Sequence, residues 1–215
     1  MKNLDFLKNG HKGPSSIIYL SLLVATISLA IVLFLHIGKG LSYSILTRDP
    51  IQIFNGYAFE GFLSSVGIIF WSATVGVCFI SALLTHGEKE KEFKFYILGL
   101  AFSSLLLLDD CFMFHDIILP DYFHISEFLI YALYAVLAVL FIIYFKNIVF
   151  LTPYYFLFLA VTFLGLSIAI DVVVNYVDLT NHYFYEDAAK FIGIVNWWIY
   201  FSSVSYLTAK GKLKF

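Results

Sequence analysis

The sequence predicts an all-α integral membrane protein with six transmembrane helices. Of its 215 residues, 61% are hydrophobic and only 13% are charged, which is about half the charged fraction of an ordinary soluble domain. Apolar stretches recur along the whole chain, and each reaches the roughly 20 residues that a helix needs to cross a hydrocarbon core. No soluble domain remains once these stretches are removed, so we expect residues 1–215 to form one polytopic helical bundle.

Polar or charged segments separate the predicted spans. The spans cover about residues 16–37, 58–84, 94–118, 124–145, 153–177 and 184–208. The first apolar run is too long for the core of a signal peptide, so we expect it to stay in the protein as an anchor. The second span follows the polar segment GKGLSYSILTRDP and ends before the charged segment THGEKEKEFK, after which the third begins.

The last four spans form two predicted hairpins. The third and fourth are joined by LPDY, and so short a connection between helices makes them antiparallel. The fifth begins after KNIVFLTP, and DLTNHYF joins it to the sixth in a similar hairpin.

The lysines predict the orientation of the bundle. If the N-terminus is cytoplasmic, ten lysines lie on the inner side, whereas the outer loops carry only Lys39 and Arg48. Lys190 falls within a span. Because positively charged loops stay in the cytoplasm, we expect both termini to be cytoplasmic, in a bacterial inner membrane.

The acidic residues gather on the opposite side. Eleven of the 15 acids and four of the six histidines map to the outer loops or to the outer halves of the spans. Ionisable groups within a span are costly and normally face the bundle interior or a water-filled cavity. We therefore expect a funnel that opens to the periplasm, with Asp109, Asp110, Asp171 and Lys190 near its floor.

Helical spacing predicts which of these groups share a face. Asp109 and Asp116 are seven residues apart and lie on one face, whereas Asp110 points about 100° away. The pair His124 and Glu127 is spaced i, i+3, so these two side chains share a face as well.

This outer set of carboxylates and imidazoles predicts a divalent metal site. Bundles that bind two metal ions use carboxylates from facing helices together with Glu-x-x-His pairs, and His124 with Glu127 is a reversed pair of this kind. A site rich in oxygen with one or two imidazoles suits iron, manganese or zinc. The candidate ligands are Asp109, His115, Asp116, His124, Glu127, Asp171, Glu186 and Asp187. The structural alternative for His124 is that it caps its own helix.

Asp110 and Lys190 are the candidate catalytic residues. Adjacent carboxylates at depth disfavour each other's ionisation, so one of Asp109 and Asp110 could hold a proton and act as a general acid. The structural alternative is that Lys190 forms an ion pair. Its partner would be Glu186 or Asp187, which lie within reach on the same helix, or one of the aspartates Asp109 and Asp110.

These features predict a metal-dependent enzyme, a hydrolase or an oxidase, that acts on a lipid or other apolar substrate reached from the bilayer. The first alternative is a proton- or ion-coupled transporter or channel that uses Asp109, Asp110 and Asp171. The second is an accessory subunit whose polar outer face binds a partner in a complex, or a second copy in an oligomer. The chain lacks a basic face for nucleic acid, and membrane lipid is the expected surrounding.

Overall fold

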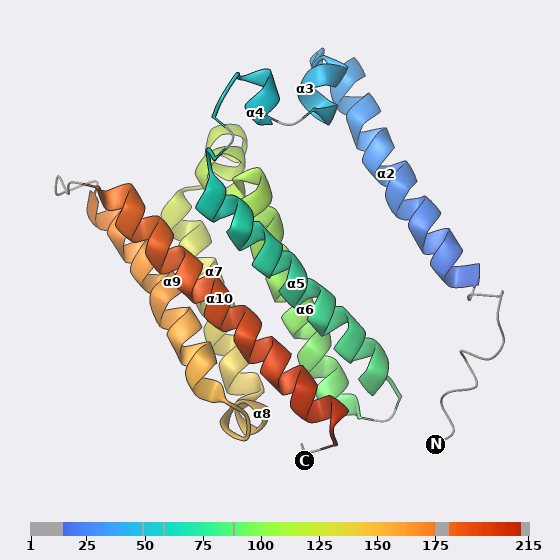
Figure 1. Ribbon diagram of the computed structural model, residues 1–215, viewed down its shortest axis with the longest axis vertical. Coiled ribbons are helices and arrows are strands. Elements are labelled where there is room, and N and C mark those ends of the chain that lie inside the picture. Colours follow the sequence, from blue (N-terminus) through green and yellow to red (C-terminus); the bar gives the residue numbers. More distant parts are fainter. Residues whose placement is uncertain (1–14, 49, 58, 88, 175–180, 212–215) are drawn as a thin grey trace. The chain divides into compact units, whose positions relative to one another are not determined.

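The computed structural model of the chain is built from helices (Figure 1). It describes residues 15–48, 50–57, 59–87, 89–174 and 181–211. The described residues contain no strand, which confirms the predicted all-α class. Some of the acids and lysines whose side of the membrane the sequence predicts lie outside the described residues, namely Asp5, Asp49, Glu88, Asp178, Lys2, Lys8, Lys12, Lys212 and Lys214. The chain divides into two units, residues 1–60 and residues 61–215.

The first unit contains one long helix and two short ones. They are α2 (Ser15–Lys39), α3 (Tyr43–Thr47) and α4 (Pro50–Ile53). Helix α2 ends at Gly40, which has a φ of 67° and donates its backbone N–H to the carbonyl of His36 at 3.0 Å. The His36 ring stacks on Tyr43 with 3.9 Å between the ring centroids, so the turn that joins α2 to α3 is held by local contacts.

The second unit contains the remaining helices. They are α5 (Phe62–Thr85), α6 (Glu90–Phe112), η1 (Phe114–Tyr122), α7 (Glu127–Tyr144), α8 (Lys146–Phe150), α9 (Tyr154–Val174) and α10 (His182–Ala209). Helix α10 packs against both α9 and α5, and α5 packs against α6 (Figure 1). Few residues separate η1 from α7, and the predicted connection LPDY forms the end of η1.

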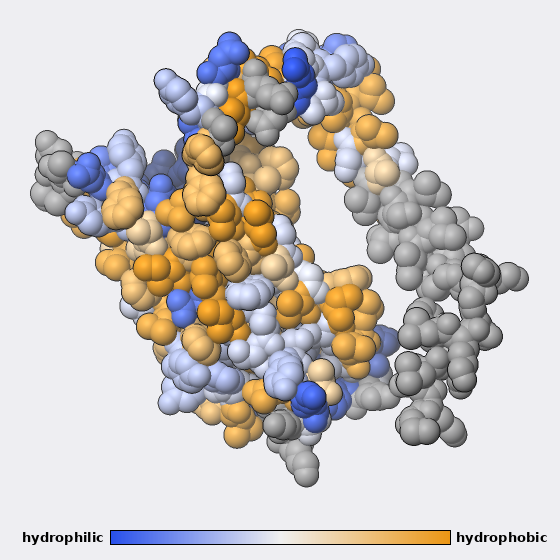
Figure 2. All heavy atoms as spheres, viewed as in Figure 1, coloured by the Kyte–Doolittle hydropathy of each residue, from blue (hydrophilic) through white to orange (hydrophobic). Residues whose placement is uncertain are grey.

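Four of these helices, α5, α6, α7 and α9, are long and apolar enough to cross a membrane. Their outer surfaces remain apolar: Leu133, Val136 and Leu140 of α7 are more than half exposed. On the face shown in Figure 2, hydrophobic residues cover most of the middle of the bundle, and hydrophilic residues gather towards the ends of its helices. Exposed apolar surface of this extent is unfavourable in water and favourable in a lipid bilayer.

The core of the second unit is aromatic. The ring of Phe95 contacts those of Phe141, Tyr200 and Phe201 at centroid distances of 5.3, 6.4 and 5.6 Å. Gly99 makes room for Phe201 of α10, because a Cβ at this position would lie 2.6 Å from Cε1 of that ring. The absence of a side chain at Gly99 therefore lets the Phe201 ring lie against α6.

The structure corrects two predicted helix boundaries near the functional residues. The third span was expected to continue to residue 118, but α6 ends at Phe112 and Met113 adopts a left-handed conformation with a φ of 53°. A π-helical segment, η1, follows it. The fourth span was expected to begin at residue 124, but His124 is also left-handed, with a φ of 55°, and α7 begins at Glu127. One left-handed residue stands on each side of η1, so the third span ends earlier and the fourth begins later than the sequence predicts.

Candidate functional site

A cavity of about 180 Å³ lies inside the second unit, between α5, α6, η1, α7, α9 and α10. One part of its wall is aromatic and aliphatic, and includes Trp71, Phe102, Leu164 and Trp197. Trp197 is fixed in this wall because its Nε1–H donates to Oγ of Ser103 at 3.0 Å. The other part of the wall is ionisable. Its side chains are Asp109, Asp110, His115, Asp171, Glu186 and Lys190.

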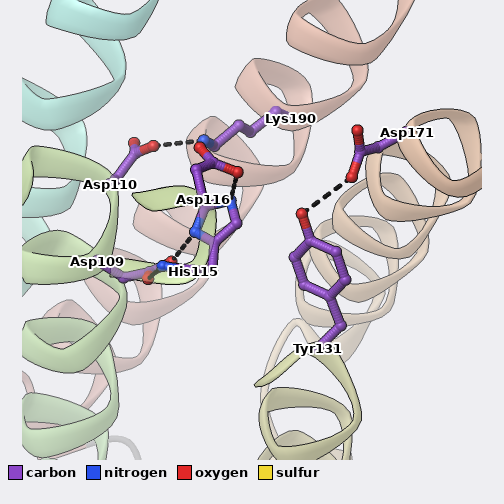
Figure 3. A network of polar contacts seen from close by, with 7 residues as sticks. All are labelled: Asp109, Asp110, His115, Asp116, Tyr131, Asp171 and Lys190. Atoms are coloured by element: carbon purple, nitrogen blue, oxygen red, sulfur yellow. Dashed lines mark hydrogen bonds and ion pairs between the residues drawn. The ribbon is translucent and has the colours of Figure 1, made fainter. Parts of the chain in front are cut away.

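His115 lies between two carboxylates (Figure 3). Its Nδ1 is 2.6 Å from Oδ2 of Asp109, and its Nε2 is 3.0 Å from Oδ1 of Asp116. Asp109 is buried and uses its other oxygen to accept the backbone N–H of His115 at 2.9 Å. This hydrogen bond replaces one that is lost where the helix breaks at Met113, so the break itself brings the imidazole back towards Asp109.

A second ion pair joins α6 to α10. Lys190 Nζ contacts Oδ1 of Asp110, whose side chain is only 6% exposed (Figure 3). The other oxygen of this carboxylate, Oδ2, is buried and has no hydrogen-bond partner among the described residues. Asp110 also borders a separate cavity of about 20 Å³ that Ser64 and Asp187 help to line. That volume is sufficient for about one water molecule.

Helices α7 and α9 meet through a third polar contact. The Tyr131 hydroxyl donates to Oδ2 of Asp171 at 3.0 Å (Figure 3). The ring of Tyr131 also lies 5.3 Å from the His115 ring, measured between centroids. Tyr131 therefore connects the pair of Asp109 and His115 to the carboxylate on α9.

The connecting segment η1 lies beyond the four helices that can span a membrane, and its ionisable groups have shifted pKa values. Burial lowers the pKa of His115, but hydrogen bonds to Asp109 and Asp116 outweigh burial and raise it to about 9. The pKa of Asp116 is lowered, mainly because its carboxylate accepts a hydrogen bond from His115. The imidazole is therefore held as a cation between two carboxylates at neutral pH.

A family model described as "Domain of unknown function (DUF8692)" matches residues 19–204. This chain belongs to the DUF8692 family. No curated protein and no solved structure matches it. The matched range includes every residue that lines the cavity, so in this DUF8692 chain the site lies within the family domain.

The structure brings together six of the ten predicted site residues. Asp109, Asp110, His115, Asp171, Glu186 and Lys190 all line the cavity. The adjacent Asp109 and Asp110 have different basic partners, His115 and Lys190. The structure also shows that Lys190 pairs with Asp110, and not with Glu186 or Asp187 on its own helix.

The other four predicted ligands do not line the cavity of this DUF8692 chain. Asp116 contacts His115 from outside the cavity, and its side chain is 52% exposed. His124, Glu127 and Asp187 are exposed. The expectation that His124 and Glu127 share a helix face is wrong, because α7 begins only at Glu127. In the part of the chain that the structure describes, no three acidic, histidine or cysteine side chains group so that they could hold a metal ion.

Several cavity residues carry no strong signal in the sequence. Trp71, Phe102 and Tyr134 line the cavity, yet they occur in apolar stretches where an aromatic residue usually packs the core or contacts lipid. Tyr131 and Tyr134 are spaced i, i+3 on α7, and this spacing places both on one helix face. The spacing would have identified Tyr134 as a further cavity residue once Tyr131 was known to contact Asp171 on α9.

Proposed function

We propose that this DUF8692 chain is an integral membrane enzyme that acts on a lipid or other apolar substrate inside the cavity. The observation that carries the proposal is that a single cavity joins an apolar wall to a wall of ionisable side chains. A substrate with an apolar body and a polar reacting group matches such a division, because each of its parts meets a wall of like polarity.

The membrane topology is part of the same proposal. Six spans, with both termini in the cytoplasm of a bacterial cell and the cavity open to the periplasm, are supported by the distribution of lysines and by four helices able to cross a membrane. Helix α10 would supply one of the remaining spans. This helix tolerates Lys190 because Asp110 neutralises the ammonium group.

The cavity offers two kinds of chemical assistance. Lys190, with Asp110 as its counter-ion, would stabilise negative charge that develops on a substrate oxygen. His115 would donate a proton from Nε2 if the substrate displaces the exposed Asp116, while Asp109 keeps the imidazole in position. The two roles together suit hydrolysis of an ester or amide bond, in which water attacks the carbonyl carbon, Lys190 stabilises the oxyanion, and the leaving group takes the proton from His115.

Filling the cavity should abolish substrate binding. Gly165 lines the cavity, and a Cβ at this position would meet no atom within 4 Å, so the side chain of Gly165→Phe can start from this wall without a clash at Cβ. We expect this variant to retain about tenfold less lipid than the wild type when native mass spectrometry is used to quantify the molecules that copurify.

Gly76→Phe is the matched control for this experiment. Gly76 lies in helix α5, does not line the cavity, and has equally open space around its Cβ position. If the two variants retain the same amounts of the same lipids, the cavity is not the substrate site.

A second observation concerns the donor atoms of the cavity. Asp109, His115, Asp171 and Glu186 line the same cavity and have the donor atoms that iron, manganese or zinc would use. We propose that a divalent ion binds there after these side chains exchange their present partners. An ion held in the cavity would make a water molecule bound to it a stronger nucleophile.

Metal analysis by inductively coupled plasma mass spectrometry tests this proposal. We expect near-stoichiometric iron, manganese or zinc in the purified protein, and its loss in Asp171→Asn because the amide is a poorer ligand than the carboxylate. His124→Ala is the control, since His124 is exposed and outside the cavity, and it should keep the metal. A folded wild-type protein that stays free of metal after supplementation would contradict metal dependence and leave the cavity proposal standing.

A further inference from the structure

The described side chains that line the cavity include more acids than bases. Asp109, Asp110, Asp171 and Glu186 supply four carboxylates, against two basic groups from His115 and Lys190. Asp116 contacts His115 from outside and adds a further carboxylate beside the cavity. When all of these groups are ionised, the wall has an excess of negative charge.

The basic groups are already matched by carboxylates. Lys190 pairs with Asp110, and His115 pairs with Asp109 and Asp116. Asp171 accepts a hydrogen bond from the Tyr131 hydroxyl. Glu186 is half-buried and has no hydrogen-bond or ion-pair partner among the described residues.

The aromatic residues of the wall also favour a cation as the ligand. Trp71, Phe102 and Trp197 line the cavity, and the faces of such rings attract cations. An anionic ligand would be repelled by the carboxylates.

We infer that the ligand of this cavity is an amphipathic organic cation, an apolar molecule that carries a protonated amine or a quaternary ammonium group. The inference rests on the proposed function, because it takes the cavity as the substrate site. This ligand and a divalent ion are alternative occupants of the same carboxylates, and the aromatic rings distinguish between them, because rings attract an ammonium group but supply no metal ligands. The ammonium group would lie near Glu186 and Asp171, and its apolar part would contact Trp71 and Trp197.

Three small probes of similar shape test the sign of the charge. Benzylamine is cationic at pH 7, benzyl alcohol is neutral and benzoate is anionic. A cavity of about 150 Å³ can hold a benzene ring, so the 180 Å³ cavity has room for each probe. Binding is measured on the purified full chain in a neutral detergent, first without and then with a metal chelator. The signal is tryptophan fluorescence, because Trp71 and Trp197 line the cavity.

We expect benzylamine to bind about tenfold more tightly than benzyl alcohol, and benzoate to bind most weakly. Glu186→Gln should remove most of the preference for the amine and leave the affinity for benzyl alcohol unchanged. Asp171→Asn serves as a second variant with the same expected effect, in case Glu186→Gln fails to fold. Asp121→Asn is the matched control, because Asp121 is exposed in η1 and does not line the cavity.

The outcomes separate this inference from the proposed function. Equal affinities for benzylamine and benzyl alcohol, unchanged in Glu186→Gln, would overturn the cation inference while the cavity remains a binding site. Binding of the amine that disappears on adding the chelator would also overturn it, in favour of a metal-mediated contact. If no probe binds, and Gly165→Phe and Gly76→Phe retain the same lipids, the cavity proposal itself fails.

Discussion

Asp110→Asn is expected to destabilise the protein by about 3 kcal/mol, because it leaves the Lys190 ammonium group without a counter-ion inside the bundle. Removal of one partner from a buried ion pair costs about 3–5 kcal/mol. The lower end applies here, since one third of the Lys190 side chain is exposed and can recover some hydration. Chemical denaturation of the purified protein in detergent measures the free energy of unfolding.

A double-mutant cycle shows whether the loss comes from the ion pair. Lys190→Met removes the ammonium group but keeps a long apolar side chain, and we expect the double variant to be more stable than Asp110→Asn alone. If the two substitutions are additive, the pair contributes no interaction energy, and this would contradict the role that the structure gives to Asp110.

Asp109→Leu should have a comparably large effect, about 3–5 kcal/mol, because Asp109 is buried and accepts hydrogen bonds from both the backbone N–H and the ring of His115. Asp109→Asn is the informative control. Its amide oxygen can still accept the backbone N–H, so the helix break at Met113 survives while the charge is lost. We expect a smaller loss of stability in this variant.

The stability of the wild type should also depend on pH through His115. Its pKa is raised from 6.5 to about 9 in the folded protein, so the stabilisation is fully present below pH 6.5 and is lost as the pH rises through about 9. Asp109 and Asp116 face the imidazole as hydrogen-bond partners, and the Tyr131 ring lies beside it. Asp109→Leu should reduce the fall in stability between these pH values. An equal fall in that variant would show that another group is responsible.

The sequence by itself determines the class of the fold and the approximate place of the site. Helix formation and hydropathy depend on residues close together in the chain, so the long apolar helices α5, α6, α7 and α9 follow from composition and length. The cost of an ionisable group inside a membrane explains why the residues that line the cavity, Asp109, Asp171 and Lys190 among them, could be predicted to gather.

Only the tertiary structure decides which of these groups contact each other. On an uninterrupted helix, His115 would lie on a different face from Asp109, but the left-handed Met113 turns its side chain back towards Asp109. The partner of Lys190 is Asp110 on another helix, because the rotation of α10 against α6 places these two side chains together. His124 is excluded from the cavity because α7 begins three residues later. Helix breaks and helix rotations result from packing between distant segments, which hydropathy and spacing along the chain do not encode.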